Sequence, residues 1–275
     1  MGIFDGYLIC SDCDGTMTDR HGVLHRKDAE AINYFQQEGG LFTFATGRFP
    51  KYIDNFLKDF RPNTYQVMAN GTTLYDVDHH AVIYEVTMEP PRELLSFVID
   101  NHLCNLIYAD HLNHSLAWCR TEEQSRRLKE AGRGDTPTDP ESLYAPDPEP
   151  WHKINFCFDS PEQTEKAEKL LHERFPEENI VRSWSTGLEL LPREGGKGPC
   201  VRKLRQLLGD RIHTVIGVGD YENDNSLLQE ADIGYAVANA SEKTKAVADR
   251  ITVSNDDHAI SAIVMELKKE IEMHV

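Results

Sequence analysis

Short apolar runs alternate with amphipathic stretches at both ends of this 275-residue chain. In the first third, apolar runs at 7–10, 41–45 and 65–68 are separated by helical patterns at 27–37 and 52–60. Apolar runs of this length are typical of buried strands, whereas apolar residues spaced three and four apart are typical of helices. The resulting order, strand-helix-strand-helix-strand, predicts a parallel sheet with right-handed crossovers.

The last third of the chain repeats this alternation. We expect helices at 201–208, 225–230, 242–248 and 259–273, and strands at 213–218, 233–237 and 251–253. Because both ends carry the same pattern, we expect them to fold together as one α/β core.

The middle of the chain has a different character. Residues 72–75 and 81–84 are expected to form a hairpin, and a Glu-Pro-Pro triplet at 89–91 then interrupts the pattern. Further on, 153–158 alternates like a half-buried strand and 162–174 has the periodicity of a helix. These elements predict a separate small α/β domain.

We therefore predict an inserted domain over residues 87–187, with the two parts of the core at 1–86 and 188–275. A polar, proline-rich stretch at 132–150 supports the insertion. An irregular loop of that length is unusual inside a compact core.

Two aspartates follow the first expected strand directly, in the sequence Asp12-Cys13-Asp14-Gly15-Thr16. Open α/β sheets bind their ligands at the carboxyl ends of the strands. Two carboxylates so close together repel each other unless a cation lies between them, so the pair favours a metal site. Aspartates that cap a tight turn are the alternative for this motif taken alone.

Two further motifs suit an anion. The second expected strand ends at Thr46-Gly47-Arg48, where a following helix would offer unpaired N–H groups, although a threonine N-cap is the alternative. Lys197 lies in a glycine-rich turn ahead of a helix, where a solvated lysine is the alternative. This turn is not a Walker A loop, because Gly198 stands where serine or threonine would bind magnesium.

A fourth motif follows the expected strand at 213–218. It contains Asp220, Asn223 and Asp224. Capping of a helix would explain one of these aspartates but hardly both at the end of such a strand. We expect a second acidic group at the sheet edge.

Four strand-end motifs of different chemical type, in a fixed order, seldom arise together by chance. The chain resembles the haloacid-dehalogenase-like (HAD) phosphohydrolase superfamily, whose order is Asp-x-Asp-x-Thr, then Thr or Ser, then Lys, then Gly-Asp with a following Asp. More narrowly it is similar to the Cof-type branch. The residues that carry this likeness are Thr46-Gly47-Arg48, Asn70-Gly71, Gly219 to Asp224, Asn239-Ala240 and Ser254-Asn255-Asp256. The resemblance implies a HAD Rossmann-like core with a parallel sheet and an inserted α/β cap of the C2 type.

The resemblance also implies roles for single residues. Asp12 is expected to attack phosphorus and form an aspartyl-phosphate, and Asp14 to act as general acid and then general base. Mg²⁺ is expected at a carboxylate oxygen of Asp12, the backbone carbonyl of Asp14 and Asp220, with Asp224 either oriented nearby or binding the metal through water. Phosphate oxygens are expected to contact Thr46, Gly47, Arg48, Lys197 and Asn223, with Thr46 and Lys197 also counted as catalytic.

The expected activity is Mg²⁺-dependent hydrolysis of a small phosphorylated metabolite, such as a sugar phosphate. A phosphomutase or another phosphotransferase would use the same aspartates, and a phosphate-binding regulatory module without turnover is a further alternative. Because every catalytic position is filled, the sequence favours an enzyme.

Three positions depart from the family pattern. Cys13 replaces the usual large aliphatic residue, Gly196 precedes Lys197 where serine is common, and His258 stands where glycine often follows the acidic pair. None of these changes removes a catalytic group. An exposed Cys13 thiol would make the site sensitive to oxidation.

The charge balance limits the partners. Lysine and arginine number 29 against 46 aspartates and glutamates, a net charge of −17. This field repels phosphate backbones and anionic lipid, so we expect neither nucleic acid nor a membrane as partner. The chain has no apolar run of about 18 residues and no basic signal-peptide region at its start, so we expect a cytoplasmic protein.

Overall fold

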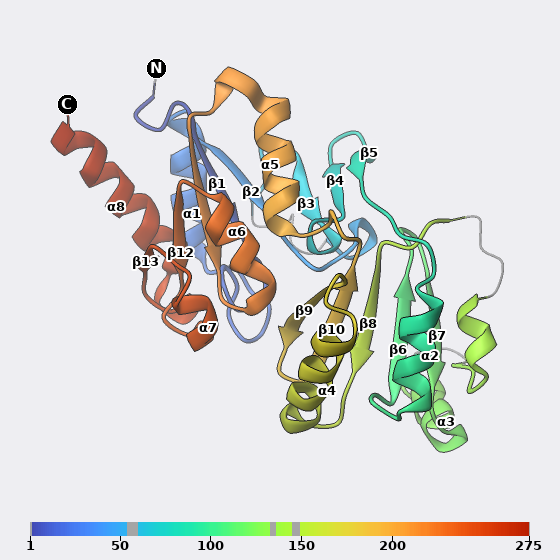
Figure 1. The fold of residues 1–275 in the computed structure, drawn as a ribbon. Helices are drawn as coiled ribbons and strands as arrows, with labels where there is room; N and C mark the ends of the chain where they lie inside the picture. Colours follow the sequence, from blue (N-terminus) through green and yellow to red (C-terminus); the bar gives the residue numbers. More distant parts are fainter. Residues whose placement is uncertain (1, 54–59, 133–135, 145–148, 275) are drawn as a thin grey trace. The chain divides into compact units, whose positions relative to one another are not determined.

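The computed structural model describes residues 2–53, 60–132, 136–144 and 149–274 (Figure 1). The chain divides into two compact units: unit 1 comprises Met1–Glu85 and Gly196–Val275, and unit 2 comprises Val86–Gly195. The sequence placed the end of the insertion at residue 187. Strand β10 (Gly187–Leu191) pairs with two strands of unit 2, so the inserted unit runs on to Gly195.

Unit 1 is built around a parallel sheet with the strand order β13-β12-β11-β1-β2. Every neighbouring pair in this sheet is parallel. The strands are β1 (Tyr7–Ser11), β2 (Leu41–Phe44), β11 (Thr214–Gly219), β12 (Ile233–Ala236) and β13 (Arg250–Ile251). The expected α/β core with a parallel sheet is confirmed.

The two faces of this sheet pack against different helices. The helices are α1 (Arg26–Gln37), α5 (Lys197–Leu208), α6 (Asn225–Glu230), α7 (Glu242–Lys245) and α8 (Ala259–His274). Ile9 and Ile216 lie in one buried cluster with residues of α1 and α8, whereas Leu8 and Val215 lie in another with residues of α5 (Figure 1). Successive residues of a strand point to opposite faces, so apolar side chains at consecutive positions bury both faces.

Two helices differ from the expectation. Helix α5 begins four residues earlier than expected, so Lys197 is its first residue and not part of a loop. Helix α7 ends at Lys245, short of residue 248. Most of the helix expected at 52–60 lies outside the described residues, and Pro50–Tyr52 form a 3₁₀ turn.

Strand β3 (Gln66–Met68) does not extend the parallel sheet as expected. It pairs antiparallel with β4 (Thr73–Asp76), which pairs with β5 (Ala81–Glu85) to complete the expected hairpin. A single parallel bridge, Ala45 to Val67, links β3 to the segment after β2. The chain reverses its direction directly after β3, where Asn70 has a positive φ. The next strand, β4, therefore returns alongside β3 and pairs with it.

Unit 2 contains an antiparallel sheet with the order β7-β6-β8-β10-β9. Its other strands are β6 (Leu106–Asp110), β7 (Ser115–Cys119), β8 (Lys153–Cys157) and β9 (Asn179–Trp184), and its helices are α2 (Arg92–Asp100), α3 (Glu122–Glu130) and α4 (Pro161–Arg174). Ile107, Phe156 and Leu188 share a buried cluster with residues of α2 and α4. This is the expected α/β insertion.

The described part of the chain contains no helix that combines the length and the apolar character needed to span a membrane.

Candidate active site

Asp12 lies at the carboxyl end of β1, which runs between β11 and β2 in the parallel sheet. Its backbone N–H donates to the carbonyl oxygen of Val218 on β11 at 2.9 Å, which fixes the turn that follows the strand. The side chain is buried. Burial raises the pKa of Asp12 well above its ordinary value, and Lys197 only partly opposes this effect.

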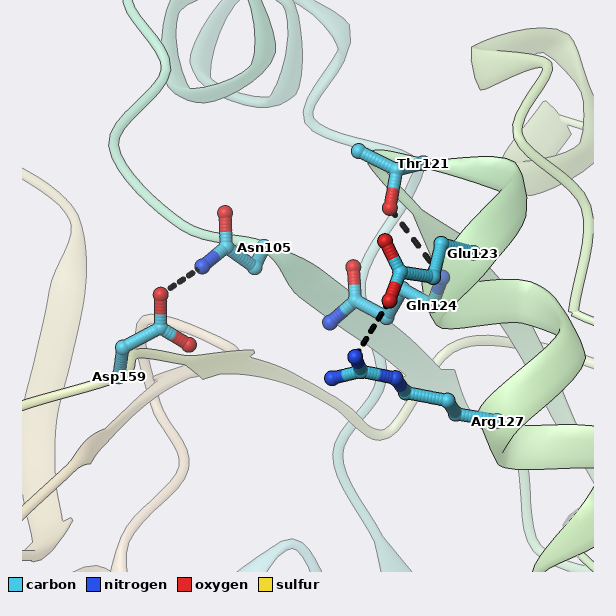
Figure 2. A pocket seen from close by; sticks show the side chains of 6 residues that line it. All are labelled: Asn105, Thr121, Glu123, Gln124, Arg127 and Asp159. Carbon is cyan, nitrogen blue, oxygen red and sulfur yellow. Dashed lines mark hydrogen bonds and ion pairs between the residues drawn. The ribbon is translucent and has the colours of Figure 1, made fainter.

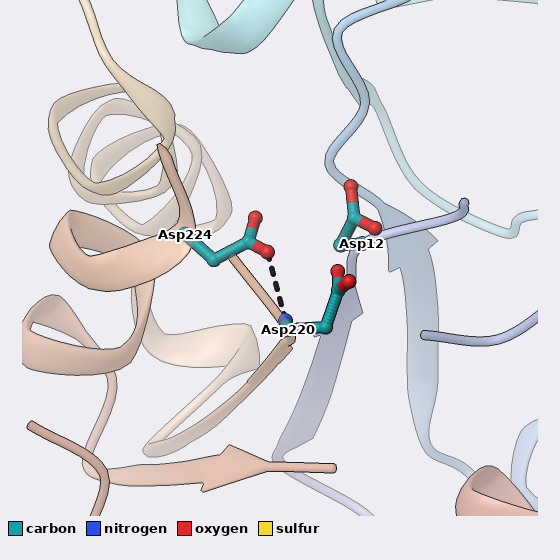
Figure 3. Close-up of side chains that lie close together, drawn as sticks. All are labelled: Asp12, Asp220 and Asp224. Atoms are coloured by element: carbon teal, nitrogen blue, oxygen red, sulfur yellow. Dashed lines mark hydrogen bonds between the residues drawn. The ribbon is translucent and has the colours of Figure 1, made fainter. Parts of the chain in front are cut away.

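Asp220 and Asp224 meet Asp12 at this edge (Figure 3). One carboxylate oxygen of each residue lies within 4.8 Å of the others. Asp220 follows β11 directly, and Asp224 accepts hydrogen bonds from the backbone N–H groups of Asp220 at 2.9 Å and Tyr221 at 3.2 Å. The loop after β11 therefore folds back on itself to present both carboxylates.

The three carboxylates suit a divalent cation. Burial, together with the charge of Asp224, raises the pKa of Asp220 to about 7. Carboxylates that repel one another in a buried place are stabilised by a hard cation such as Mg²⁺, which prefers oxygen ligands. Asp12, Asp220 and Asp224 form the one such cluster of potential metal ligands that the described residues contain.

Lys197 lies between two of these carboxylates. Its Nζ is 2.5 Å from Oδ1 of Asp12 and 2.5 Å from Oδ1 of Asp224, and its side chain is fully buried. Burial alone would lower the pKa of Lys197, but the two carboxylates outweigh burial and raise it. The lysine is thus a fixed positive charge, and the alternative of a solvated lysine is wrong.

A glycine makes this position of Lys197 possible. Gly71 has a positive φ of 82°, and a Cβ atom there would lie 2.1 Å from the carbonyl oxygen of Gly196. Any side chain at residue 71 would push the start of α5 away. The close approach of these two backbones sets Lys197 at the sheet edge.

Asp14 is not part of the cluster formed by the three carboxylates. Its side chain is 54% exposed and forms an ion pair with Arg48, with Arg48 Nη2 2.7 Å from Asp14 Oδ1. The hydrogen bonds that Arg48 donates to the Asp14 carboxylate raise the pKa of Arg48. The sequence placed both residues at the site but did not predict their pairing.

The expected phosphate-binding residues lie at the end of β2. Thr46 is buried, and its Oγ1 accepts a hydrogen bond from the backbone N–H of Arg48 at 3.2 Å. Thr46 therefore keeps its own hydroxyl proton for an acceptor. Gly47 lies beside the side chain of Asn70, whose Oδ1 accepts from Nδ2 of Asn223 at 3.0 Å.

Three side chains position the loop after β1, and the sequence assigned them no role. Thr16 Oγ1 donates to Asp220 Oδ1 at 2.9 Å. Asn239 Nδ2 donates to the carbonyl oxygen of Gly15 at 2.8 Å, and Asn255 Nδ2 donates to that of Thr18 at 2.9 Å. Both asparagines belong to the Cof-type pattern, and this was the one signal in the sequence that could have identified them.

Cys13 is buried, with 1% of its surface exposed. Burial raises the pKa of its thiol well above the ordinary value, and the charge of Asp12 adds to this effect. The thiolate is the form that oxidants attack. Sensitivity of the site to oxidation was expected only for an exposed Cys13 thiol, and this thiol is buried.

Unit 2 has a polar pocket of about 270 Å³ (Figure 2). It is lined by Asn105, Thr121, Glu123, Gln124, Arg127 and Asp159. The charged groups in it are already paired, Asp159 with Asn105 and Glu123 with Arg127. Thr121 caps α3 by accepting from the N–H of Gln124.

Comparisons with known proteins agree with this geometry. A family model described as haloacid dehalogenase-like hydrolase matches residues 9–264. The chain is 26% identical to the phosphatase YwpJ of Bacillus subtilis, over 94% of this chain and 99% of that protein. It is 23% identical to the pyridoxal phosphate phosphatase YbhA of Escherichia coli, over 94% of this chain and 97% of that protein.

A solved structure shares the fold. The structure of a sugar phosphatase described as HAD subclass IIB matches with a TM-score of 0.77 and 20% identity, over 96% of this chain and 99% of that chain. The match shows that both the core and the inserted unit have counterparts in that subclass.

Proposed function

Because the chain belongs to the haloacid dehalogenase-like hydrolases and is a phosphatase of that family, we propose that it hydrolyses a small phosphorylated metabolite in two Mg²⁺-dependent steps. Asp12 is the nucleophile, and Asp14 is the general acid and base. The observation that carries this proposal is the contact of Lys197 with both Asp12 and Asp224 at 2.5 Å, at the edge where three carboxylates meet.

Asp12 acts in the first step. Its carboxylate oxygen attacks phosphorus while the bond from phosphorus to the ester oxygen breaks, and Asp14 gives its proton to the leaving alkoxide. The product is an aspartyl-phosphate. Lys197 supports this role, because an ammonium 2.5 Å from Asp12 favours the ionised carboxylate and opposes the effect of burial.

Asp14 acts again in the second step. It takes a proton from a water molecule, the water oxygen attacks the phosphorus of the aspartyl-phosphate, and inorganic phosphate leaves with Asp12 restored. The exposure of the Asp14 carboxylate supports this role, because the group must exchange a proton with an alcohol and then with water.

Asp12, Asp220 and Asp224 would hold Mg²⁺, together with the backbone carbonyl of Asp14. Bound Mg²⁺ would offset the repulsion between the Asp12 carboxylate and the anionic phosphate. The convergence of three carboxylate oxygens, with Asp12 and Asp224 buried and Asp220 half-buried, and the raised pKa of Asp220 support this assignment.

The phosphate oxygens would contact Thr46, the N–H of Gly47, Arg48 and Lys197. Each of these groups donates hydrogen bonds, and charge develops on these oxygens during the transfer. Asn223 would contribute through the orientation of Asn70, since its amide already donates to that residue.

The substrate class is a phosphomonoester of a small metabolite. Relatives described as a pyridoxal phosphate phosphatase and a sugar phosphatase support this choice. We propose a sugar phosphate or a compound of similar size as the substrate.

Release of inorganic phosphate tests the proposal. The wild-type protein and Asp12→Asn are compared on p-nitrophenyl phosphate, pyridoxal phosphate and a panel of sugar phosphates, each with Mg²⁺ and with chelator. We expect turnover with Mg²⁺ in the wild type and none above background in the variant. Isomerised sugar phosphate without net phosphate release would indicate a mutase, and a folded wild type inactive on every compound would indicate a binding module.

A further inference from the structure

His258 stands at the start of α8 in a backbone conformation that glycine adopts more easily. Its φ is 70° and its ψ is 59°, in the left-handed region. A histidine in this region is held there against a steric preference, and glycine would be free of that strain. Glycine would lack the side-chain contacts that the imidazole makes at this position.

The imidazole contacts a buried carboxylate. His258 Nδ1 lies 3.4 Å from Oδ2 of Asp28, and the side chain of Asp28 is 1% exposed. The other carboxylate oxygen, Oδ1, accepts from the backbone N–H of Ser261 at 2.8 Å. Burial raises the pKa of Asp28 and the charge of His258 opposes this effect. His258 Nδ1 and Asp28 Oδ2 are both buried and neither makes a hydrogen bond to a described residue, so their ion-pair contact is what the structure offers to both atoms.

His25 completes the group, which we call the histidine clasp: His25, Asp28 and His258. The two imidazole rings are 5.2 Å apart and nearly perpendicular. His25 is the N-cap residue of α1, and Asp28 lies in the first turn of that helix. The clasp thus joins the first turns of α1 and α8.

The clasp lies at the end of the loop that carries Asp14. This loop, residues 13–24, leaves the site and enters α1 at His25. Asn255, three residues before His258, donates to the carbonyl oxygen of Thr18 at 2.9 Å, and its own N–H donates to Oδ1 of Asn239 at 3.0 Å. A shift of the start of α8 would therefore move the groups that hold this loop.

We propose that His258 is a positioning residue: through Asp28 and His25 it fixes the start of α8 against α1 and so holds the loop that carries Asp14 at the sheet edge. The consequence for turnover rests on the proposed function, because Asp14 is its general acid and base.

Three variants separate the imidazole from the backbone conformation. His258→Gly introduces a residue that accepts a φ of 70° and removes the imidazole ring. His258→Asn keeps a residue that tolerates this region and a polar group near the position of Nδ1. The matched control is His80→Gly, because His80 also has a positive φ, 50°, but lies exposed in the turn between β4 and β5.

Two measurements are compared at a temperature where every variant is folded. Hydrogen exchange is followed for the amides of residues 13–24, several of which are hydrogen-bonded within the loop, such as Thr18 to Cys13. In His258→Gly we expect exchange of this loop to be at least about tenfold faster, with the central strands unchanged. We also expect kcat for p-nitrophenyl phosphate to fall about tenfold or more, because small displacements of a catalytic group have effects of this size. His258→Asn should recover most of both losses, and His80→Gly should match the wild type.

Unchanged exchange of residues 13–24 in His258→Gly would overturn the proposal, as would faster exchange with unchanged kcat. If His258→Gly does not fold, Asp28→Asn replaces it, since this variant keeps the acceptor for Ser261 and removes the charge next to His258. If the wild type releases no phosphate at all, the proposed function fails, while the exchange of the loop still decides whether the clasp holds it.

Discussion

Arg48 holds Asp14 through two parallel hydrogen bonds: Nε lies 2.9 Å from Oδ2, and Nη2 lies 2.7 Å from Oδ1. The planar guanidinium matches a carboxylate in this arrangement. It matches a phosphate equally well, so a bound phosphomonoester would compete with Asp14 for the same donors. Under the proposed mechanism, binding of the substrate would thus release Asp14, the general acid, from Arg48.

Replacing Arg48 tests this relationship. In Arg48→Ala we expect the KM for a phosphomonoester to rise roughly 10- to 100-fold, since a charged hydrogen bond contributes about 1.5–3 kcal/mol. Arg48→Lys should recover little of the loss, because an ammonium cannot donate as a planar fork. Steady-state kinetics measures this, with Arg26→Ala on the exposed side of α1 as control. A KM equal to that of the wild type would exclude Arg48 from phosphate binding.

Lys197→Met should destabilise the metal-free protein. The substitution leaves Asp12 and Asp224 buried without their cation, and breaking a buried ion pair from one side has an effect of about 3–5 kcal/mol. Urea unfolding in chelator measures the free energy of unfolding. Mg²⁺ should recover part of the loss, because it supplies positive charge to the same carboxylates.

The control for this variant is Lys269→Met on α8, which removes an exposed lysine of the same length. We expect its free energy of unfolding to stay within about 0.5 kcal/mol of the wild type. If Lys197→Met is as stable as this control in chelator, then Lys197 does not compensate the two carboxylates.

The meeting of Asp12 and Asp220 at one edge of the sheet follows from features visible in the sequence. Each aspartate comes directly after an apolar run, and the carboxyl ends of parallel strands meet at the same edge. Lys197 is 185 residues from Asp12 in the chain, so its position came from the family resemblance and not from spacing.

Other parts of the site depend on side-chain conformation and long-range contacts that a pattern does not encode. Arg48 pairs with Asp14 because of the rotamers that the two side chains adopt, one after β1 and the other after β2. The bond from Asn255 to Thr18 joins residues 237 positions apart, and both belong to irregular segments without periodicity. The antiparallel pairing of β3 was missed for a related reason, since its short apolar run fits either kind of sheet.

Mg²⁺ should raise the melting temperature of the wild type and not that of Asp220→Asn. A ligand that binds only the folded state stabilises it by RT ln(1 + [L]/Kd), about 2.7 kcal/mol at a hundredfold excess over Kd. Asp220→Asn removes one of the three carboxylates that meet at the edge. Thermal melts with and without Mg²⁺ measure the shift, and the exposed Asp210→Asn serves as control. An equal shift in Asp220→Asn would place the metal elsewhere.

The pair formed by Asp76 and His79 should make stability depend on pH. His79 Nδ1 lies 2.8 Å from Asp76 Oδ2, and this hydrogen bond, with the charge of Asp76, raises the pKa of His79. Burial would raise the pKa of Asp76, but the hydrogen bonds from His79 lower it. The contribution of His79 is therefore present at low pH and lost as pH rises through its folded-state pKa. That of Asp76 is present at higher pH and lost as pH falls through its own folded-state pKa.

The pair should consequently stabilise the fold most in the window between these two values. We expect the difference in free energy of unfolding between the wild type and His79→Gln to be positive near about pH 5 and to shrink toward zero by about pH 9. Urea unfolding at a series of pH values measures this difference, with His80→Gln as the neighbouring control. Because His79 is exposed, salt should reduce the difference as well. A difference that stays constant across this range would mean that His79 contributes through packing alone and not through its charge.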